Sequence, residues 1–484
     1  MTSASQDQES LKENEKAVLQ KRVKTISPGY RWELLILLFL AYFFHQSDRA
    51  IYGIVATSIQ DALGFTDSQL YSTRTVMFTL MALIVPFAGY VGDRFNKKKL
   101  LIGCLLCWSV ATICTGCVTG LIGMIVFNSI GLVVAEAFYG PASTSLIASY
   151  HKETRAIALS VHQTAVYLSV IFSGFIAAWI CEHFGLLVKF LEPDVPDSVL
   201  TWLCEHFGWR GTFWAFGAAS IVIGILLIFR LKDPSKVKFA EGTEIDVPKT
   251  EEKPSVAEFL GMIFRNPSAL LLTVGFTAIV FVNNAYLNVV PKFLQEKFNL
   301  SQTSAGFNGM FWHHIAAFGC IYLGGWLSDH IAKTRPTYRP KQQFVAMALG
   351  APAVAFIGSV GSVSAVYALF FLMGACRGFY ECNTHASVFE TIPSKYRSTT
   401  VGFMIFFAFI IGAWSSQMVG AFVKQFGIEM GYKYSFIVLG MTWIVGACCV
   451  GLAAFGTFRR DRERRIAFEN AAIEKETDGT AVGE

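Results

Sequence analysis

The sequence predicts an all-α membrane protein with twelve transmembrane helices, arranged as two pseudo-symmetric six-helix bundles with both termini in the cytoplasm. Three observations lead to this fold class. Of the 484 residues, 53% are hydrophobic and only 15% are charged, whereas roughly a quarter are charged in an ordinary soluble domain. Apolar runs long enough to cross a bilayer recur along the chain, and two short motifs occur once in each half.

The apolar runs divide the chain into segments. Crossing about 30 Å of hydrocarbon takes roughly 20 mostly apolar helical residues. We expect such spans at 32–57, 72–93, 98–117, 119–149, 155–183, 209–231, 268–291, 304–328, 342–361, 363–389, 397–424 and 434–458. The resulting domains are an N-terminal tail (1–31), a first bundle (32–231), a linker (232–267), a second bundle (268–458) and a C-terminal tail (459–484).

Lysine and arginine residues set the expected orientation. Cytoplasmic loops retain positive charge, and most of the 40 Lys and Arg residues fall in the tails, the linker and the loops on their side. The net charge of +5 is therefore an orientation signal, and it predicts no nucleic-acid partner. The first 30 residues lack the apolar core of a cleaved signal peptide, so we expect the first span to direct insertion into the plasma or inner membrane.

Two motifs recur at matching places in the two halves. Residues 89–98 (GYVGDRFNKK) follow the second span, and residues 325–330 (GWLSDH) follow the eighth. Residues 155–160 (RAIALS) follow the fourth span, and residues 397–402 (RSTTVG) follow the tenth. Repeats of this kind predict two related six-span units.

The motif at 89–98 resembles the signature of the major facilitator superfamily, Gly-x-x-x-Asp-Arg-x-x-Lys-Lys, and the resemblance covers nearly the whole chain. It implies a transporter whose two bundles rock about a central site. The second copy departs from the pattern because it carries His330 where Arg or Lys is common.

The motif also has a physical logic of its own. Gly89 permits close helix packing, Asp93 suits the positive end of a neighbouring helix, and Arg94 with Lys97 can bridge to carboxylates. We therefore expect five gating residues: Gly89, Asp93, Arg94, Lys97 and Asp329. The alternative is that the lysines serve only as a topology anchor.

A narrower resemblance is to the Spinster-like and anion:cation symporter branches of this superfamily. It depends on Asp48-Arg49 in the first span, Glu136-Ala137 in the fourth and the Gly-Trp-Arg at 208–210. Those branches carry organic anions, sugar acids and lysolipids. Asp48 and Glu136 match the acidic positions to which the coupling proton is assigned in proton-coupled relatives.

Ionisable side chains within spans are costly unless they face water or a partner, so each is a functional candidate. The first span carries a polar stripe at helical spacing: His45, Asp48, Arg49 and Tyr52. We expect this stripe to line a central cavity. Adjacent helical residues point about 100° apart, so Glu136 is a better partner for Arg49 than Asp48 is. The alternative to proton coupling is an ion pair that only orders the first and fourth spans.

The tenth span offers a second charged stripe, in which Arg377, Glu381 and His385 lie four residues apart. Either Arg377 and Glu381 neutralise each other, or Arg377 binds a substrate carboxylate while Glu381 or His385 exchanges a proton. Lys292 is interpreted as a residue that snorkels to the interface, with substrate binding as the alternative. Arg74 either guides an anion at the outer mouth or is an ordinary helix-end arginine.

These residues predict a secondary active transporter of a small polar, anionic solute, such as a sugar acid, another organic carboxylate or a sugar, driven by proton symport. The expected proton-coupling residues are Asp48, Glu136 and Glu381. The expected substrate-binding residues are His45, Arg49, Tyr52, Tyr139, His162, Gln163, Asn284, Asn288, Arg377 and His385. The alternatives are a Spinster-like carrier of lysolipids or other amphiphiles and a sensor that transports nothing.

The remaining expectations concern partners and cofactors. No Gly-rich nucleotide loop or nucleophile motif occurs in the sequence, so we expect neither an enzyme nor a cofactor, and no metal site. The expected partners are a small-molecule substrate, protons with sodium as the alternative coupling ion, and the lipid bilayer. We expect a monomer.

Overall fold

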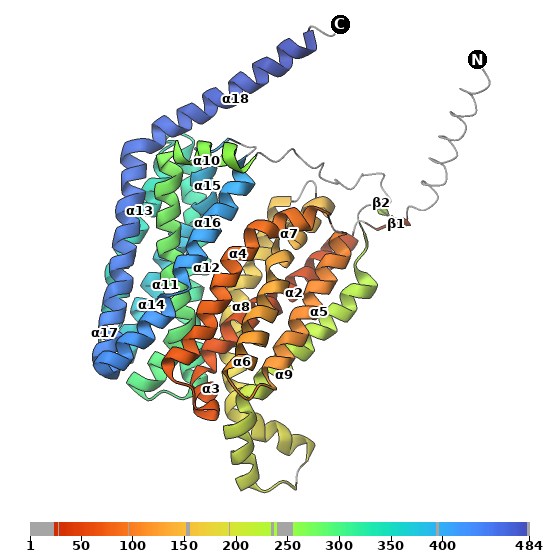
Figure 1. Ribbon diagram of the computed structural model, residues 1–484, viewed down its shortest axis with the longest axis vertical. Coiled ribbons are helices and arrows are strands. Elements are labelled where there is room, and N and C mark those ends of the chain that lie inside the picture. Colours follow the sequence, from red (N-terminus) through yellow and green to blue (C-terminus); the bar gives the residue numbers. More distant parts are fainter. Residues whose placement is uncertain are drawn as a thin grey trace, which may run out of the picture.

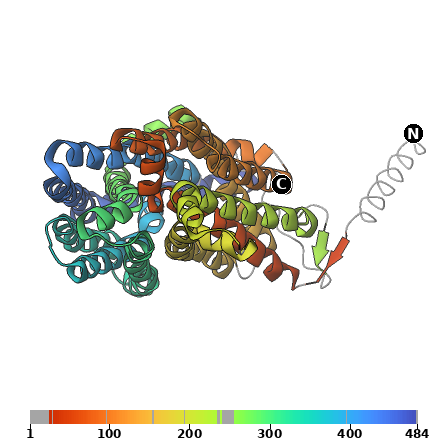
Figure 2. The same cartoon turned by 90° about the horizontal axis from the view of Figure 1, so that it is seen from below.

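The computed structural model describes residues 24–27, 29–94, 96–151, 155–192, 194–233, 237–239, 255–393 and 396–481. These residues fold almost entirely into helices that form two bundles (Figure 1). The end-on view in Figure 2 shows the two bundles side by side, with the short strands β1 and β2 at the outer edge of the first.

The first bundle contains α2 (Tyr30–Ile54), α3 (Ala56–Leu63), α4 (Asp67–Arg94), α5 (Lys97–Thr115), α6 (Leu121–Met124), the π-helix η1 (Ile125–Gly131), α7 (Leu132–Tyr150), α8 (Arg155–Leu191) and α9 (Asp197–Arg230). Gly64 ends α3 with φ 65°, a conformation that glycine adopts without strain. The Asn96 side chain accepts a hydrogen bond from the backbone of Lys99 and so caps α5. Strand β1 (Lys24–Ile26) pairs in parallel with β2 (Val237–Phe239), with Lys24 opposite Val237.

The second bundle contains α10 (Val256–Phe264), α11 (Pro267–Phe298), α12 (Gln302–Ala332), α13 (Tyr338–Phe356), α14 (Val363–Glu381), α15 (Thr384–Phe389), α16 (Arg397–Gly412), α17 (Ser415–Leu452), the π-helix η4 (Ala453–Thr457) and α18 (Phe458–Ala481). Gly427 interrupts α17 with φ 77° and ψ 173°. This break reverses the chain between the two last predicted spans.

Within the described residues, eight stretches are long and apolar enough to cross a membrane. They are Tyr30–Ile54, Lys97–Thr115, Leu121–Thr144, Val161–Gly185, His206–Arg230, Pro267–Phe298, Val363–Phe389 and Thr399–Ala471. Helices α4, α12 and α13 occupy three other predicted spans but are not among these eight. The all-helical, multi-pass class is thus confirmed, whereas the number of twelve and the cytoplasmic termini remain predictions.

The two bundles meet at the end of the molecule formed by α3, the start of α4, the end of α11 and the start of α12, which we call the closed end. Toward the opposite end, which carries α10 and α18, the ribbons of the two bundles diverge (Figure 1). Hydrogen bonds across the closed end join Thr57 to Gln295 at 2.9 Å and Ser68 to Gln417 at 2.8 Å. Glu182 of α8 accepts bonds from the backbone and hydroxyl of Thr303 at the start of α12.

Candidate functional site

An ion pair joins α2 to α7 within the first bundle. Arg49 Nη1 lies 3.1 Å from Glu136 Oε1, and the Nε2 atom of His45 lies 3.9 Å from the same oxygen. Glu136 is 9% exposed and Arg49 is 21% exposed. The partner expected for Arg49 from helix geometry is therefore the one that the structure contains.

Arg49 also reaches the boundary between the bundles. Its guanidinium lies 5.7 Å from the ring centre of Phe78 in α4 and 5.6 Å from that of Phe409 in α16. The two rings stack on each other across the boundary, with centres 5.7 Å apart. A cation near aromatic rings is attracted by the ring quadrupoles, which leaves part of its hydrogen-bonding capacity for another acceptor.

Asp48 points into the first bundle, away from this boundary. It is 2% exposed, and its Oδ2 accepts a 2.8 Å hydrogen bond from Thr112 of α5. Its Oδ1 is buried and has no hydrogen-bond partner among the described residues. The stripe expected to line one cavity is thus divided, because neighbouring helical positions face different elements.

Three of the expected substrate ligands form a stacked aromatic cluster. Tyr42 stacks on His162 at a centroid distance of 4.4 Å, and His45 stacks on Tyr139 at 5.3 Å. The Tyr139 hydroxyl donates to the carbonyl of Leu38 at 3.1 Å. Tyr42 was missed by the sequence reasoning, although its position three residues before His45 on the same helical face was a usable signal.

The second bundle holds a matching ion pair at its own boundary. Arg377 Nε lies 2.7 Å from Glu381 Oε1, four residues along α14. Arg377 also donates to Asn283 of α11 and lies 3.1 Å from Nε2 of His313. Tyr167, which belongs to α8 of the first bundle, donates a 2.7 Å hydrogen bond to the other oxygen of Glu381. The pair therefore touches both bundles.

Two other expected ligands, Tyr52 and Asn288, make hydrogen bonds to backbone carbonyls. The Tyr52 hydroxyl donates to the carbonyl of Leu70, and Asn288 donates to the backbone of Asn284, each at 2.7 Å. Gln163 and His385 have exposed side chains. Their roles in substrate binding remain predictions.

The structure describes the side chains of only some of the expected gating residues. The side chains of Gly89, Asp93 and Arg94 lie outside the described residues, and Lys97 begins α5 with a half-buried side chain.

In the second copy of the motif, Asp329 pairs with Arg339 at 2.6 Å, and Arg339 pairs with Glu390 at 3.0 Å. Burial raises the pKa of Glu390, while Arg339 and Arg462 oppose the rise.

Two further cations, Lys292 and Arg74, are buried. Lys292 is 3% exposed and pairs with Asp67 of the first bundle, so it does not snorkel to an interface. Arg74 is 1% exposed, donates to Asn128 at 2.9 Å and lies 4.0 Å from the Tyr52 ring centre. It is buried within the first bundle rather than exposed at a mouth. Among the described residues, no three His, Cys, Asp or Glu side chains are grouped as metal ligands.

Comparisons with known proteins agree with this architecture. The chain is 23% identical to protein spinster homolog 1 of Xenopus tropicalis, over 94% of this chain and 87% of that protein. It is 26% identical to the probable sulfoacetate transporter SauU of Cupriavidus necator, over 89% of this chain and 94% of that one.

Among solved structures, it resembles a bacterial homologue of the human lysosomal transporter Spinster in an inward-facing, unoccupied conformation. The TM-score is 0.74 at 20% identity, covering 90% of this chain and 99% of that chain. The family model of the Major Facilitator Superfamily matches residues 38–416. The two-bundle chain with its paired boundary charges is therefore a member of the Major Facilitator Superfamily.

Proposed function

We propose that this transporter carries a small organic anion by alternating access and couples its movement to protons. The observation that carries the proposal is that each bundle brings an arginine–carboxylate pair to the common boundary: Arg49 with Glu136 and Arg377 with Glu381. A guanidinium is the side chain best suited to bind a carboxylate or sulfonate through two hydrogen bonds.

An anionic solute accounts for this arrangement better than a neutral one does. Arg49 shares its charge with Glu136 through one nitrogen and otherwise rests against aromatic rings. A substrate anion can therefore compete with Glu136 for Arg49 without leaving the cation unpaired. One relative is described as a probable sulfoacetate transporter and another as a gallate transporter, and both names denote organic anions.

Proton coupling is proposed for Asp48 and Glu136, with Glu381 as their counterpart in the second bundle. A buried carboxyl with one unpaired oxygen is costly to keep charged, and Asp48 Oδ1 is such an atom. When substrate binds Arg49 it withdraws the counter-charge from Glu136, which favours proton uptake at this cluster. Substrate and proton then cross the membrane together.

The conformation of the structure also fits alternating access. Thr57 bonds to Gln295 and Lys292 pairs with Asp67 at the closed end, and Tyr167 bonds to Glu381 at a boundary pair. If the termini are cytoplasmic, as the charge distribution predicts, the structure represents an inward-facing state. The motif residues Gly89, Asp93, Arg94, Lys97 and Asp329 are then proposed to close the opposite end.

Uptake into proteoliposomes tests the proposal. The panel is sulfoacetate, gallate, a sugar acid, the neutral sugar and a lysolipid, each measured with a proton gradient, a sodium gradient and neither. We expect saturable uptake of at least one anion that the proton gradient accelerates.

The replacement Arg49→Lys keeps the positive charge but loses the planar guanidinium that can form two parallel hydrogen bonds. The KM for that anion should therefore rise by roughly tenfold or more.

Other results contradict the proposal in distinct ways. Uptake of the lysolipid alone would favour the amphiphile carrier, and acceleration by sodium alone would reject the proton. An absence of flux for every compound, in protein that still unfolds cooperatively, would favour the sensor.

A further inference from the structure

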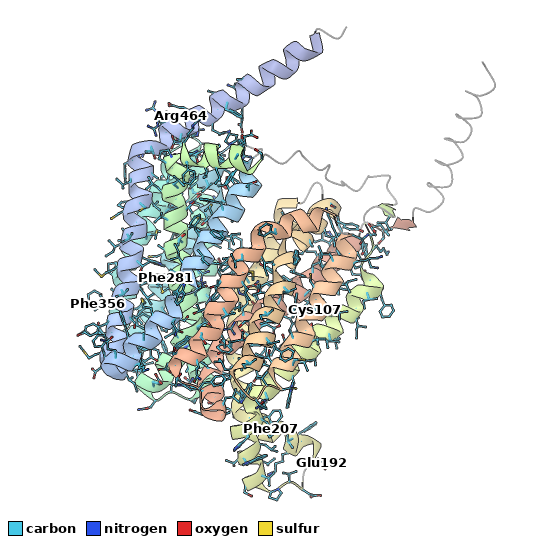
Figure 3. The ribbon with its side chains drawn as sticks, in the orientation of Figure 1. Cys107, Glu192, Phe207, Phe281, Phe356 and Arg464 are labelled. Atoms are coloured by element: carbon cyan, nitrogen blue, oxygen red, sulfur yellow. The ribbon has the colours of Figure 1, made fainter. Side chains whose placement is uncertain are left out.

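A cavity lies between the linker helix α10 and the C-terminal helix α18, outside the boundary between the bundles. Its volume is about 800 Å³, and it is lined by residues of α10 and α18, the turn after α10 and the segment around Pro393. Figure 3 labels Arg464, which projects from α18 beside the end that carries α10. The transport cycle proposed above assigns nothing to this cavity.

The wall of the cavity is rich in arginine. Arg265, Arg464 and Arg465 line it, together with two carboxylates, Glu258 and Asp461. Arg465 donates to Glu469 at 2.6 Å, whereas Arg464 lies 3.8 Å from Asp461 and is 61% exposed. Arg265, which directly follows α10, is also exposed.

Both carboxylates have structural partners of their own. Asp461 is 3% exposed, and its Oδ2 accepts hydrogen bonds from the backbone and the hydroxyl of Ser268, at 3.1 and 2.7 Å. It thereby caps the start of α11. Glu258 accepts a 2.5 Å hydrogen bond from the Tyr396 hydroxyl. Arg265 and Arg464 therefore remain as cations that a ligand can engage.

The cavity also adjoins apolar surface at the expected membrane boundary. Phe468 of α18 and Met262 of α10 line the cavity; Phe468 is 46% exposed and Met262 is half-buried. The candidate span of α11 begins at Pro267, only two residues after Arg265. Arginines beside exposed apolar side chains at such a boundary match a phosphate group attached to acyl chains.

We propose that this cavity binds the phosphate headgroup of an anionic glycerophospholipid, with Arg265 and Arg464 as the phosphate ligands and Met262 and Phe468 against the acyl chains. The bound lipid joins α10 to α18 and so fixes the linker helix to the second bundle. A soluble phosphate compound shares the headgroup chemistry but has no acyl chains that could contact the apolar side chains.

Thermal unfolding of the full-length protein in detergent tests the site. Dioleoyl phosphatidic acid should raise the unfolding midpoint more than dioleoyl phosphatidylcholine, because a ligand that binds only the folded state stabilises it. The double variant Arg265→Gln/Arg464→Gln should weaken the apparent affinity for phosphatidic acid by about tenfold or more, because it removes both cations that bind the phosphate. The matched control is Lys333→Gln/Arg335→Gln, which removes two exposed cations outside the cavity.

Three outcomes would overturn the proposal. Equal stabilisation by both lipids would remove the phosphate specificity. An equal loss in the control variant would show non-specific attraction of a basic surface. Stabilisation by glycerol 3-phosphate as large as that by phosphatidic acid, unchanged in Met262→Ser/Phe468→Ser, would assign the site to a soluble anion. Native mass spectrometry that counts the bound lipids provides a readout independent of unfolding and transport.

Discussion

At the scale of single residues, two buried carboxylates of the first bundle carry the proposed coupling. We predict that Asp48→Asn or Glu136→Gln abolishes uphill accumulation driven by a pH gradient, while counterflow of substrate continues, because a neutral amide cannot exchange the proton. The measurement is accumulation against counterflow in proteoliposomes. Asp61→Asn is the matched control, since Asp61 is an exposed acid of α3. Uphill accumulation that survives in both carboxylate variants would reject the assignment.

Lys292 forms an ion pair with a carboxylate of the other bundle. Its ammonium is buried against Asp67, and Gln60 and Glu296 also contact it. Removing one member of a buried pair leaves the other uncompensated, at a cost of about 3–5 kcal/mol when both are fully buried. Asp67 is 20% exposed, so the cost here is smaller.

We therefore predict that Lys292→Gln shifts the molecule toward a state in which the closed end is open, by roughly tenfold or more in population. Distances between spin labels at Asp61 and Gln425, in protein whose exposed native cysteines are replaced by serine, measure the shift. Lys297→Gln is the control, because Lys297 bonds to Gly358 within its own bundle. An unchanged distance distribution in Lys292→Gln would show that the pair does not hold the closed end.

Side-chain partners were predictable where helix geometry alone decides them. The spacing of Arg377 and Glu381 along one helix, and the divergent directions of Asp48 and Arg49, both follow from 3.6 residues per turn. The pairing of Lys292 with Asp67 depends on how two bundles meet in one conformation. No local pattern encodes that contact, and the preference for snorkelling was wrong for this reason.

At the scale of elements, close packing between α8 and α12 depends on two glycines. A Cβ atom on Gly174 would lie 2.6 Å from the carbonyl oxygen of Gly306, and one on Gly306 would lie 2.5 Å from that of Gly174. These helices belong to different bundles, so the glycines allow the closed end to close.

We predict that Gly174→Ala and Gly306→Ala open the closed end and slow transport, although alanine is the better helix former by about 1 kcal/mol. The same spin-label distances and the initial rate of uptake measure the effect. Gly103→Ala is the control because a Cβ atom there meets nothing within 4 Å. A transport rate as low in Gly103→Ala as in the other two would point to helix stiffness instead of contact.

The sequence predicted where helices lie better than where they end. The sixth span was expected to begin at 209, but α9 begins at Asp197 and continues to Arg230 without a break. The sequence Cys-Glu-His-Phe-Gly occurs at 181–185 within α8 and again at 204–208 within α9. The break at Gly427 has a positive φ, which glycine adopts without strain. A glycine in the sequence does not by itself require a break, so the position of this break could not be predicted.

At the scale of the whole molecule, transport requires the closed end to separate. We predict that a short bifunctional thiol reagent joining Ser68→Cys to Gln417→Cys stops transport, because these positions lie on opposite bundles and their native side chains bond at 2.8 Å. The control pair is Glu33→Cys/Arg230→Cys, whose native side chains pair at 2.8 Å within the first bundle. Full activity of the cross-linked Ser68/Gln417 pair would exclude rocking of the bundles.

The division into two bundles was predictable because related motifs occur in both halves of the chain, at 89–98 and 325–330. The direction in which the molecule opens was not, because both conformations use the same helices. It depends on the balance of contacts at the two ends of the molecule.

The contact of Glu182 with Thr303 gives the long ends of α8 and α9 a mechanical consequence. These helix ends project past the closed end as a hairpin (Figure 1), and Glu182 at its base grips the first turn of α12 in the other bundle. A binding protein that contacts both the hairpin and that turn would recognise only one conformation of the transporter. Such a binding protein would hold the transporter in that conformation and stop the transport cycle. It would also provide a rigid marker for imaging the transporter.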